Sequence, residues 1–391
     1  MCAPPLTSSD RRDLRIDFFR GLALYIILID HIGSNPIARF TYHRFGFSDG
    51  AEAFVFLSGL SCGIAYYAVM HRRGLKGLAK AIARRGTLIF AFYVLASVAT
   101  ILLVSGETHS FLPVSNLERP LARYANEPLA SIWSAILLIE QPSFPGILIL
   151  YIGLTFAAVP TYLLAVRYSA LAAGFVLGIS GCVWLIAQFY HFGAPFTILF
   201  PYFDIFAWQF LFLIGMYVGV RYRRNEGFPL TSHPSICTAL VALAWVIVIV
   251  SFVSRFSPFI GRTLNVDLSF LVPYGLADPE FKYHLCGYRL IHFLSAAVLV
   301  TTYVKANNPI LQWGHRIMID TGRWSLQIFS LGAVLSVLVT TVFHAYDLNV
   351  FGKLTFVLVA VLLTSLATVL LTRYELRTKA TDSVAVATRS R

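Results

Sequence analysis

Residues 17–59, DFFRGLALYIILIDHIGSNPIARFTYHRFGFSDGAEAFVFLSG, are the stretch that decides the fold. They form two apolar runs joined by a polar loop, a pattern that predicts two membrane helices and their connection. Charged groups are costly inside a bilayer, so those found there are candidate functional residues. The ionisable groups inside or at the ends of these runs are Asp17, Arg20, Asp30, His31, Asp49 and Glu52.

The spacing of Arg20 and His31 places them on one side of the first helix. Eleven positions separate them, which at about 100° per residue is close to three full turns. They are about 16 Å apart along the axis at a rise of about 1.5 Å per residue. Asp17 falls on the same face, one turn before Arg20. A stripe with a cation at one end and an imidazole near the other fits an elongated anionic ligand with its reactive end deep in the membrane.

The composition predicts an all-α polytopic membrane protein. Of the 391 residues 57% are hydrophobic and only 13% are charged, too few for the surface of a soluble protein of this length. The net charge of +12 could suggest nucleic acid, but the Lys and Arg residues cluster between apolar runs, so we expect no nucleic-acid partner. The basic segment 71–86 fits lipid headgroups, or alternatively the phosphates of a cytoplasmic cofactor.

Hydropathy predicts about ten transmembrane helices and therefore places both termini on one side. The predicted spans are 17–34, 50–70, 87–105, 145–166, 169–190, 202–220, 235–254, 288–304, 324–343 and 353–372. The bias of Lys and Arg puts that side in the cytoplasm, so the orientation is N-in and C-in.

Three further segments complete this organisation. Residues 1–15 form a cytoplasmic N-terminal segment, and the polar tail 374–391 is predicted to be cytoplasmic and disordered. The apolar stretch 129–140 is too short to cross the bilayer, which predicts an interfacial or re-entrant helix.

Each ionisable group in the first two spans also has a structural explanation. Arg20 could anchor its helix by reaching to the headgroups, and His31 could form a hydrogen bond between helices. Asp49 and Glu52 could cap the second helix, because acids in the first turn complement its dipole. As a general base, His31 would need a carboxylate to hold its ring, and these two acids are the candidates.

Polar groups also stand in two later spans. Trp208 and Gln209 fall in the sixth, where packing and interface anchoring would explain the tryptophan. Arg289 and His292 lie one turn apart on one face of the eighth. No pair among the five cysteines has the spacing of zinc ligands, so we expect no metal site.

The run GLSCG at 59–63 has the letters of the nucleophile motif G-x-S-x-G. It lies inside an apolar helix and not at the strand-to-helix turn that exposes such a serine, so we reject that function. Close helix packing through small residues is the better interpretation. The candidate pairs are Gly59 and Gly63, Gly174 and Gly178, and Gly215 and Gly219.

Several blocks of the chain resemble a known family. Arg20, ten residues and His31 resemble the R-x10-H signature of the membrane acyltransferase-3 superfamily. Within it, the chain is similar to the OpgC family, linked to succinylation of osmoregulated periplasmic glucans. The similar blocks are RDLRIDFFRGLAL (12–24), FGFSDGAEAFVFLSG (45–59), FAWQFLFLIG (206–215), FKYHLCGYRLIHFL (281–294) and GRWSLQIFSLG (322–332).

This resemblance implies a fold and a reaction. Residues 16–373 would form an acyltransferase-3-like transmembrane domain in the bacterial inner membrane. An acyl-CoA, succinyl-CoA in this family, would bind from the cytoplasm. Its acyl group would pass to hydroxyls of a periplasmic glucan or a related polysaccharide.

The resemblance also implies roles for individual residues. His31 would be the catalytic histidine, assisted by Glu52 and Asp49, and Arg20 with Asp17 would bind the donor. The weaker assignments, to substrate binding, are Trp208, Gln209, Arg289 and His292. The chain departs from the family pattern at Gly146, where an Asp is expected, and at Asp204, where an Asn is expected. Either difference could alter the acceptor or the acyl group.

Two other classes of function stay open on the sequence. A secondary transporter or exporter also uses intramembrane His, Arg and carboxylate groups as proton relays, although paired halves with broken helices are not evident. A non-catalytic membrane subunit of a glucan-modifying complex is the second alternative. Release of free CoA by the isolated chain would separate an enzyme from both. The sequence leaves the oligomeric state undetermined.

Overall fold

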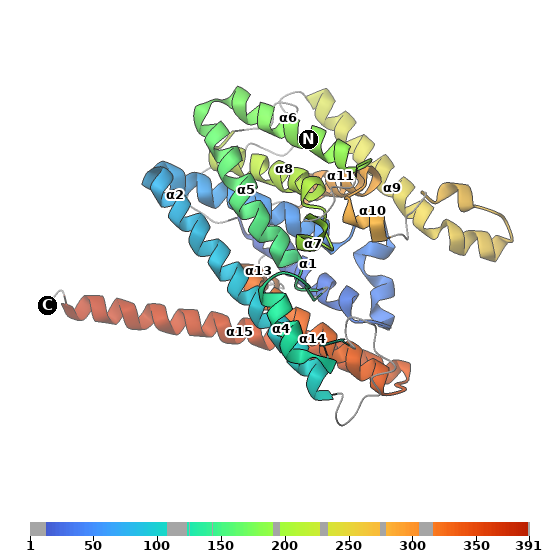
Figure 1. Ribbon diagram of the computed structural model, residues 1–391. Helices are drawn as coiled ribbons and strands as arrows, with labels where there is room; N and C mark the ends of the chain where they lie inside the picture. The colour runs from blue at the N-terminus through green and yellow to red at the C-terminus, as the bar shows by residue number, and fades with distance from the viewer. Residues whose placement is uncertain are drawn as a thin grey trace.

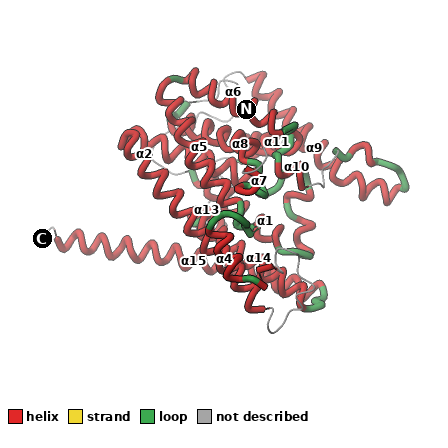
Figure 2. Tube along the Cα trace, viewed as in Figure 1, coloured by secondary structure: helices red, strands yellow, loops and turns green. Residues whose placement is uncertain are grey.

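The computed structural model describes residues 13–107, 123–124, 126–142, 144–190, 196–226, 234–273, 279–304 and 316–389. All regular structure in these ranges is helical (Figure 2), which confirms the all-α fold. The α-helices are α1 (Leu14–His31), α2 (Gly50–Glu107), α4 (Pro128–Ile136), α5 (Ile147–Tyr168), α6 (Ala170–Ala187), α7 (Phe196–Leu199), α8 (Ile205–Arg223), α9 (Pro234–Leu264), α10 (Pro279–Tyr283), α11 (Gly287–Tyr303), α13 (Arg316–Arg323), α14 (Ser325–Ala345) and α15 (Val350–Arg389). Short 3-10 helices are η1 (Pro36–Phe40), η2 (Tyr42–Arg44) and η5 (Ser269–Leu271).

Among the described helices, 7 are long and apolar enough to cross a membrane, so the chain is a multi-pass membrane protein. They are α2, α5, α6, α8, α9, α14 and α15. The predicted spans 17–34 and 288–304 coincide with α1 and α11, which fall outside this set. The charges of α1 and the 17-residue length of α11 explain why. The count of ten spans and the N-in, C-in orientation stay predictions.

The basic segment 71–86, which we expected to be a loop between two spans, is helical and belongs to α2. Its many Lys, Arg, Ala and Leu residues are good helix formers, which explains why the helix continues through it. The continuity is broken at Gly74, where φ is 64° and ψ is −168°. Glycine takes this conformation without steric cost, so the chain can turn inside α2 (Figure 1).

Of two other segments with a predicted structure, the first is helical as expected and the second is helical where disorder was expected. Helix α4 (Pro128–Ile136) covers most of the stretch 129–140 predicted to be a short helix, and it packs against α2. The tail from residue 374, predicted to be disordered, is helical instead, because α15 continues without a break to Arg389. This end of α15 extends away from the other helices (Figure 1).

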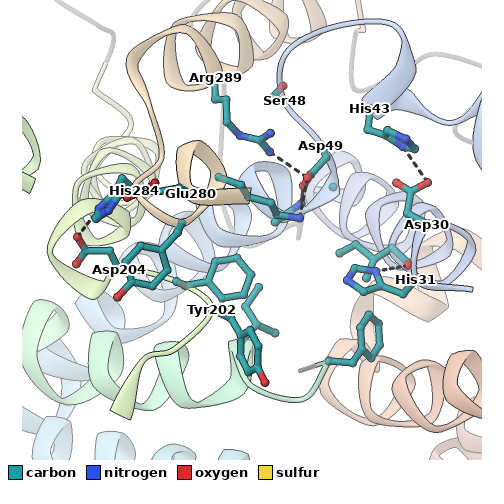
Figure 3. A pocket seen from close by; sticks show the side chains of 18 of the residues that line it. Asp30, His31, His43, Ser48, Asp49, Tyr202, Asp204, Glu280, His284 and Arg289 are labelled. Atoms are coloured by element: carbon teal, nitrogen blue, oxygen red, sulfur yellow. Dashed lines mark hydrogen bonds and ion pairs between the residues drawn. The ribbon is translucent and has the colours of Figure 1, made fainter. Parts of the chain in front are cut away.

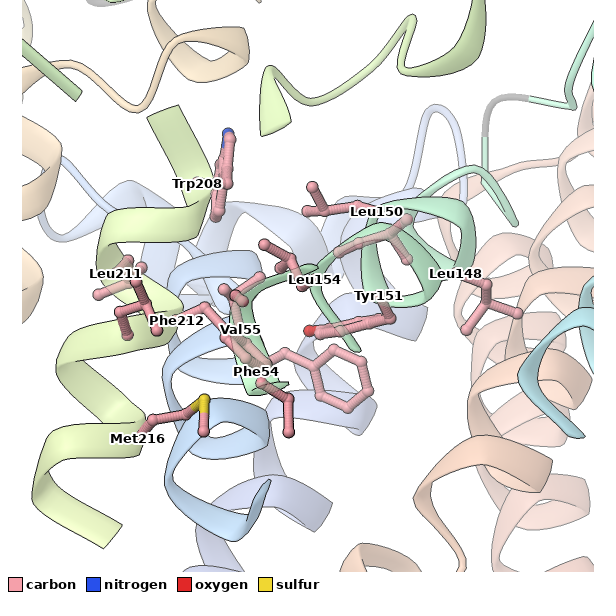
Figure 4. Close-up of a cluster of buried hydrophobic side chains, with 14 of the residues drawn as sticks. Phe54, Val55, Leu148, Leu150, Tyr151, Leu154, Trp208, Leu211, Phe212 and Met216 are labelled. Carbon is pink, nitrogen blue, oxygen red and sulfur yellow. The ribbon is translucent and has the colours of Figure 1, made fainter. Parts of the chain in front are cut away.

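The centre of the core is the contact between α2 and α8. Figure 4 shows the buried side chains that α2, α5 and α8 bring together there. A Cβ added to Gly59 would lie 2.1 Å from the carbonyl oxygen of Phe212, and one added to Gly215 would lie 2.3 Å from that of Phe56. The predicted close packing of the 59/63 and 215/219 pairs is therefore confirmed.

A valine at Gly215 is expected to destabilise the protein by about 1–3 kcal/mol, because its side chain would force apart two backbones in contact. Gly174→Val is the matched control, since no atom of the described residues lies within 4 Å of a Cβ at that position. The predicted packing of the 174/178 pair is wrong for the same reason. Thermal unfolding in detergent measures both variants, and equal losses would contradict this account of the α2–α8 contact.

Helix α1 is fixed between α2, α13 and α14. A Cβ at Gly21 would lie 1.9 Å from the carbonyl oxygen of Met318, and one at Gly322 would lie 1.8 Å from that of Asp17. These glycines let the backbones of α1 and α13 touch. The contact holds α1, and with it the Arg20–His31 stripe, in one position.

Candidate active site

The end of α1 opens into a cavity of about 780 Å³ (Figure 3). Its walls come from the end of α1, the loop before α2, the start of α5, the residues before α8, α10, and single residues of α9, α11 and α14. The ionisable residues in the lining are Asp30, His31, His43, Asp49, Tyr202, Asp204, Arg255, Glu280, Lys282, Tyr283, His284 and Arg289. A cavity of this size suits a small-molecule substrate.

His31 is exposed to this cavity and is held by its own helix. Its Nδ1 lies 2.8 Å from the carbonyl oxygen of Ile27. A carbonyl can only accept, so Nδ1 carries a proton, and in the neutral form of the ring the lone pair is then on Nε2. The ring of Phe144 packs edge-on against the imidazole at 4.0 Å between centroids. In the neutral form, His31 would present to the cavity a ring nitrogen that bonds to no described residue, and this nitrogen could take a proton.

Asp49 and Glu52 form their described hydrogen bonds and ion pairs with groups other than His31, whose ring is bonded to Ile27 instead. Nε of Arg289 donates to Glu52 at 2.7 Å, and Nη2 donates to Asp49 at 3.0 Å. The ammonium group of Lys282 lies 2.8 Å from Asp49. The two acids are thus committed to cations that arrive from α10 and α11.

This network sets the charge of Asp49 and leaves Glu52 with no exposure to solvent. Burial alone would raise the pKa of Asp49, but the charges of Lys282 and Arg289 outweigh it and hold this pKa well below its ordinary value. Asp49 is therefore ionised at neutral pH. Both acids also cap α2, because Asp49 accepts from the amide of Ala51 and Glu52 from that of Asp49, each at 2.8 Å.

Arg20 lies at the opposite end of the stripe. Its Nη2 donates to the hydroxyl of Ser325 at 2.5 Å, while its Nε is buried with no hydrogen-bond partner among the described residues. Asp17 and Arg85 are close enough to interact electrostatically with it. The Nε of Arg20 can therefore donate one further hydrogen bond, and Arg85 adds a second positive charge nearby.

A small cavity of about 10 Å³ lies between Arg20 and the His31 cavity, along the same helix. It is apolar, with Leu24 of α1 and Gly332 of α14 among its lining residues. Ile27, Phe144 and Phe329 line both cavities. Along α1, the small apolar cavity therefore lies between Arg20 at one end and His31 at the other.

Three of the weaker sequence assignments lie behind the cavity wall. Trp208 is fully buried and donates to the carbonyl of Tyr283 at 2.9 Å. Gln209 is bonded to Ser180, with Nε2 donating to its carbonyl at 2.9 Å. The structure places both among protein atoms, and neither lines the cavity.

His292 likewise supports the wall instead of lining it. Its Nδ1 accepts from the amide of Ser48 at 3.3 Å and from the Ser48 hydroxyl at 2.7 Å. Its ring fills the space beside Gly46, where an added Cβ would lie 2.2 Å from Nε2. Of the four weaker assignments, Arg289 alone lines the cavity.

Two Asp–His pairs in the cavity were missed by sequence reasoning. Nδ1 of His284 lies 3.0 Å from Asp204, and Nδ1 of His43 lies 3.1 Å from Asp30. Asp204 had been noticed as a departure from the family pattern, but nothing local indicated its partner. Among the described residues no group of three His, Cys, Asp or Glu is arranged to hold a metal ion.

Comparison with known proteins gives one match. The family model described as OpgC protein matches residues 12–376, a range that contains the α1 stripe and the whole cavity lining. No curated protein matches the chain, and no solved structure matches it.

Proposed function

Because this chain belongs to the OpgC family, we propose that it transfers a succinyl group from cytoplasmic succinyl-CoA to a hydroxyl of a periplasmic glucan. Membership of the family implies a glucan succinyltransferase-like function. The observation that carries the detailed proposal is the α1 stripe, on which a buried guanidinium nitrogen without a described partner and the imidazole of His31 stand at opposite ends of one helix.

The donor would lie along this stripe. Its phosphates would bind at Arg20 and Arg85, the two cations that interact at the far end. The apolar arm would pass the small cavity, and the thioester would lie beside His31. Widening of that cavity is required for the arm to enter, so donor binding would be coupled to movement of α14 against α1.

His31 would act as the general base for the acceptor. Nε2 takes the proton from a glucan hydroxyl as the oxygen attacks the thioester carbonyl carbon. The carbon–sulfur bond then breaks, and the thiolate leaves with the proton returned from Nε2. The carbonyl of Ile27 keeps the ring in the tautomer that this step needs. The ester forms, the thioester is lost and free CoA is the second product.

The experiment is an assay of the purified chain in lipid nanodiscs with succinyl-CoA and a neutral periplasmic glucan. We expect free CoA to appear in step with a succinyl mass increment on the glucan. A transporter would release no CoA, and a non-catalytic subunit would be inactive alone. A succinyl increment in glucans from a deletion strain complemented with this chain would establish the same activity in the cell.

Replacing Arg20 with alanine is expected to raise KM for succinyl-CoA about 10- to 100-fold, the effect of losing one or two charge-assisted hydrogen bonds. The effect on kcat should be small, because Arg20 is about three helical turns from His31. Arg84→Ala is the control, since this arginine adjoins Arg85 in the basic segment 71–86 but is exposed. An unchanged KM in the Arg20 variant would move the donor site elsewhere.

A further inference from the structure

The cations in the cavity lining differ in whether they form ion pairs with acids. Lys282 is paired with Asp49, and Arg289 is paired with both Asp49 and Glu52. These two cations and two acids balance one another. Arg255 of α9 lines the same cavity and takes no part in this network.

Arg255 is held by a backbone carbonyl and by no described acid. Its Nε and Nη2 donate to the carbonyl oxygen of His43 at 3.3 and 3.1 Å. The charged groups that interact with it electrostatically are Arg44 and Arg289, both cations. Within the described ranges its Nη1 has no hydrogen-bond partner. A half-buried guanidinium without a described acid partner is costly unless an anion joins it.

The position of Arg255 relates it to the candidate base. Asp30 adjoins His31 in the chain, and its carboxylate lies 3.1 Å from Nδ1 of His43. The carbonyl of His43 then binds Arg255. This series of contacts connects Arg255 to the end of α1 that carries His31, and both residues line the same cavity.

We propose that Arg255 binds the terminal carboxylate of the succinyl group and so selects a dicarboxylic acyl donor. This inference rests on the proposed function and assigns the acyl-recognition residue of its cavity. The order along the donor would be phosphates at Arg20, thioester at His31 and free carboxylate at Arg255. Each anionic end of the donor would then meet an arginine that has a guanidinium nitrogen without a described hydrogen-bond partner.

Guanidinium chemistry suits this role. Its planar fork forms paired hydrogen bonds with a carboxylate, and it stays charged at every physiological pH. A donor ending in a methyl group would fill the same space but leave Arg255 without an anion. Sites built around such a polar contact reject the analogue that lacks it more strongly than apolar pockets reject a missing methylene.

The test compares succinyl-CoA with butyryl-CoA, which has a methyl group in place of the carboxylate. The measured quantity is the ratio of kcat/KM for the two donors, from CoA release in nanodiscs with a glucan acceptor. We expect Arg255→Gln to lower this ratio about 10- to 100-fold, the loss of one charge-assisted pair. Arg255→Lys should restore part of it, because the charge returns without the fork.

Arg262→Gln is the matched control, since it removes an exposed arginine from the same helix outside the cavity lining. Its ratio should equal that of the wild type. An equal loss for both donors in Arg255→Gln would assign Arg255 a structural role in holding the His43 carbonyl, and would overturn the proposal.

A second measurement needs no variant and separates this inference from the function on which it rests. Wild-type protein is offered succinyl-CoA, its monomethyl ester and butyryl-CoA. A strong preference for the free carboxylate supports the proposal, and comparable transfer from all three overturns it while leaving the acyltransferase intact. Transfer from none of them would overturn the proposed function itself.

Discussion

His31→Ala is expected to abolish succinyl transfer, lowering kcat by about 10²- to 10⁴-fold, the range that a general base contributes. The side chain removed is the one imidazole of the α1 stripe. Its Nε2 keeps a lone pair because Nδ1 donates to Ile27. The assay is CoA release from succinyl-CoA in nanodiscs, with the mass of the glucan as the second readout.

Binding of the donor should survive this change, because Arg20 lies at the other end of the helix. The dissociation constant for succinyl-CoA, measured by calorimetry on the inactive variant, is therefore expected to stay within about threefold of the wild type. His31→Gln tests the base more narrowly, since the amide fills similar space but is a far weaker proton acceptor. His344→Ala is the control, because this histidine is exposed at the end of α14 and outside the cavity lining. Substantial turnover by either His31 variant would remove the general-base role.

The features that the sequence predicts well are those within one helix. Arg20 and His31 share a face because helical periodicity fixes the relation of positions eleven apart, whatever surrounds them. The long apolar helices are also predictable, because hydropathy depends only on the residues within each segment. The carbonyl that orients His31 also belongs to its own helix, four residues earlier in the chain.

The contacts between helices are what sequence reasoning missed. Asp49 and Glu52 accept hydrogen bonds from Arg289, which is 237 positions from Glu52 in the chain. Asp204 is paired with His284, which is 80 positions away. Nothing in the local pattern of an acid shows which cation will reach it. Small-residue spacing has the same limit, because Gly174 repeats the pattern of Gly215 and faces open space.

The second large effect concerns the buried ion network that joins α2 to α10 and α11. Arg289→Met removes the partner of Glu52, whose side chain has no exposure and whose other hydrogen bond is to the amide of Asp49. An acid buried without its cation costs far more than the pair contributes. We expect this variant to lose about 3–5 kcal/mol of stability. Because Arg289 and Asp49 line the cavity, we also expect this part of its wall to rearrange.

Restoring the charge balance should recover most of that loss. The double variant Arg289→Met with Glu52→Gln leaves Asp49 paired with Lys282 at 2.8 Å and removes the orphaned charge. It should therefore recover most of the about 3–5 kcal/mol that the single variant loses, because replacing both members of a buried pair with neutral groups is often neutral for stability. Unfolding in detergent measures the stability of the wild type and the two variants.

Arg323→Met is the control, because its partner Glu375 lies 3.0 Å away at the surface, where such a pair is worth about 0–1 kcal/mol. If the single variant were as stable as this control, the network would not be what holds α11 against α2. The cavity that carries Arg255 and His31 would then owe its shape to packing alone.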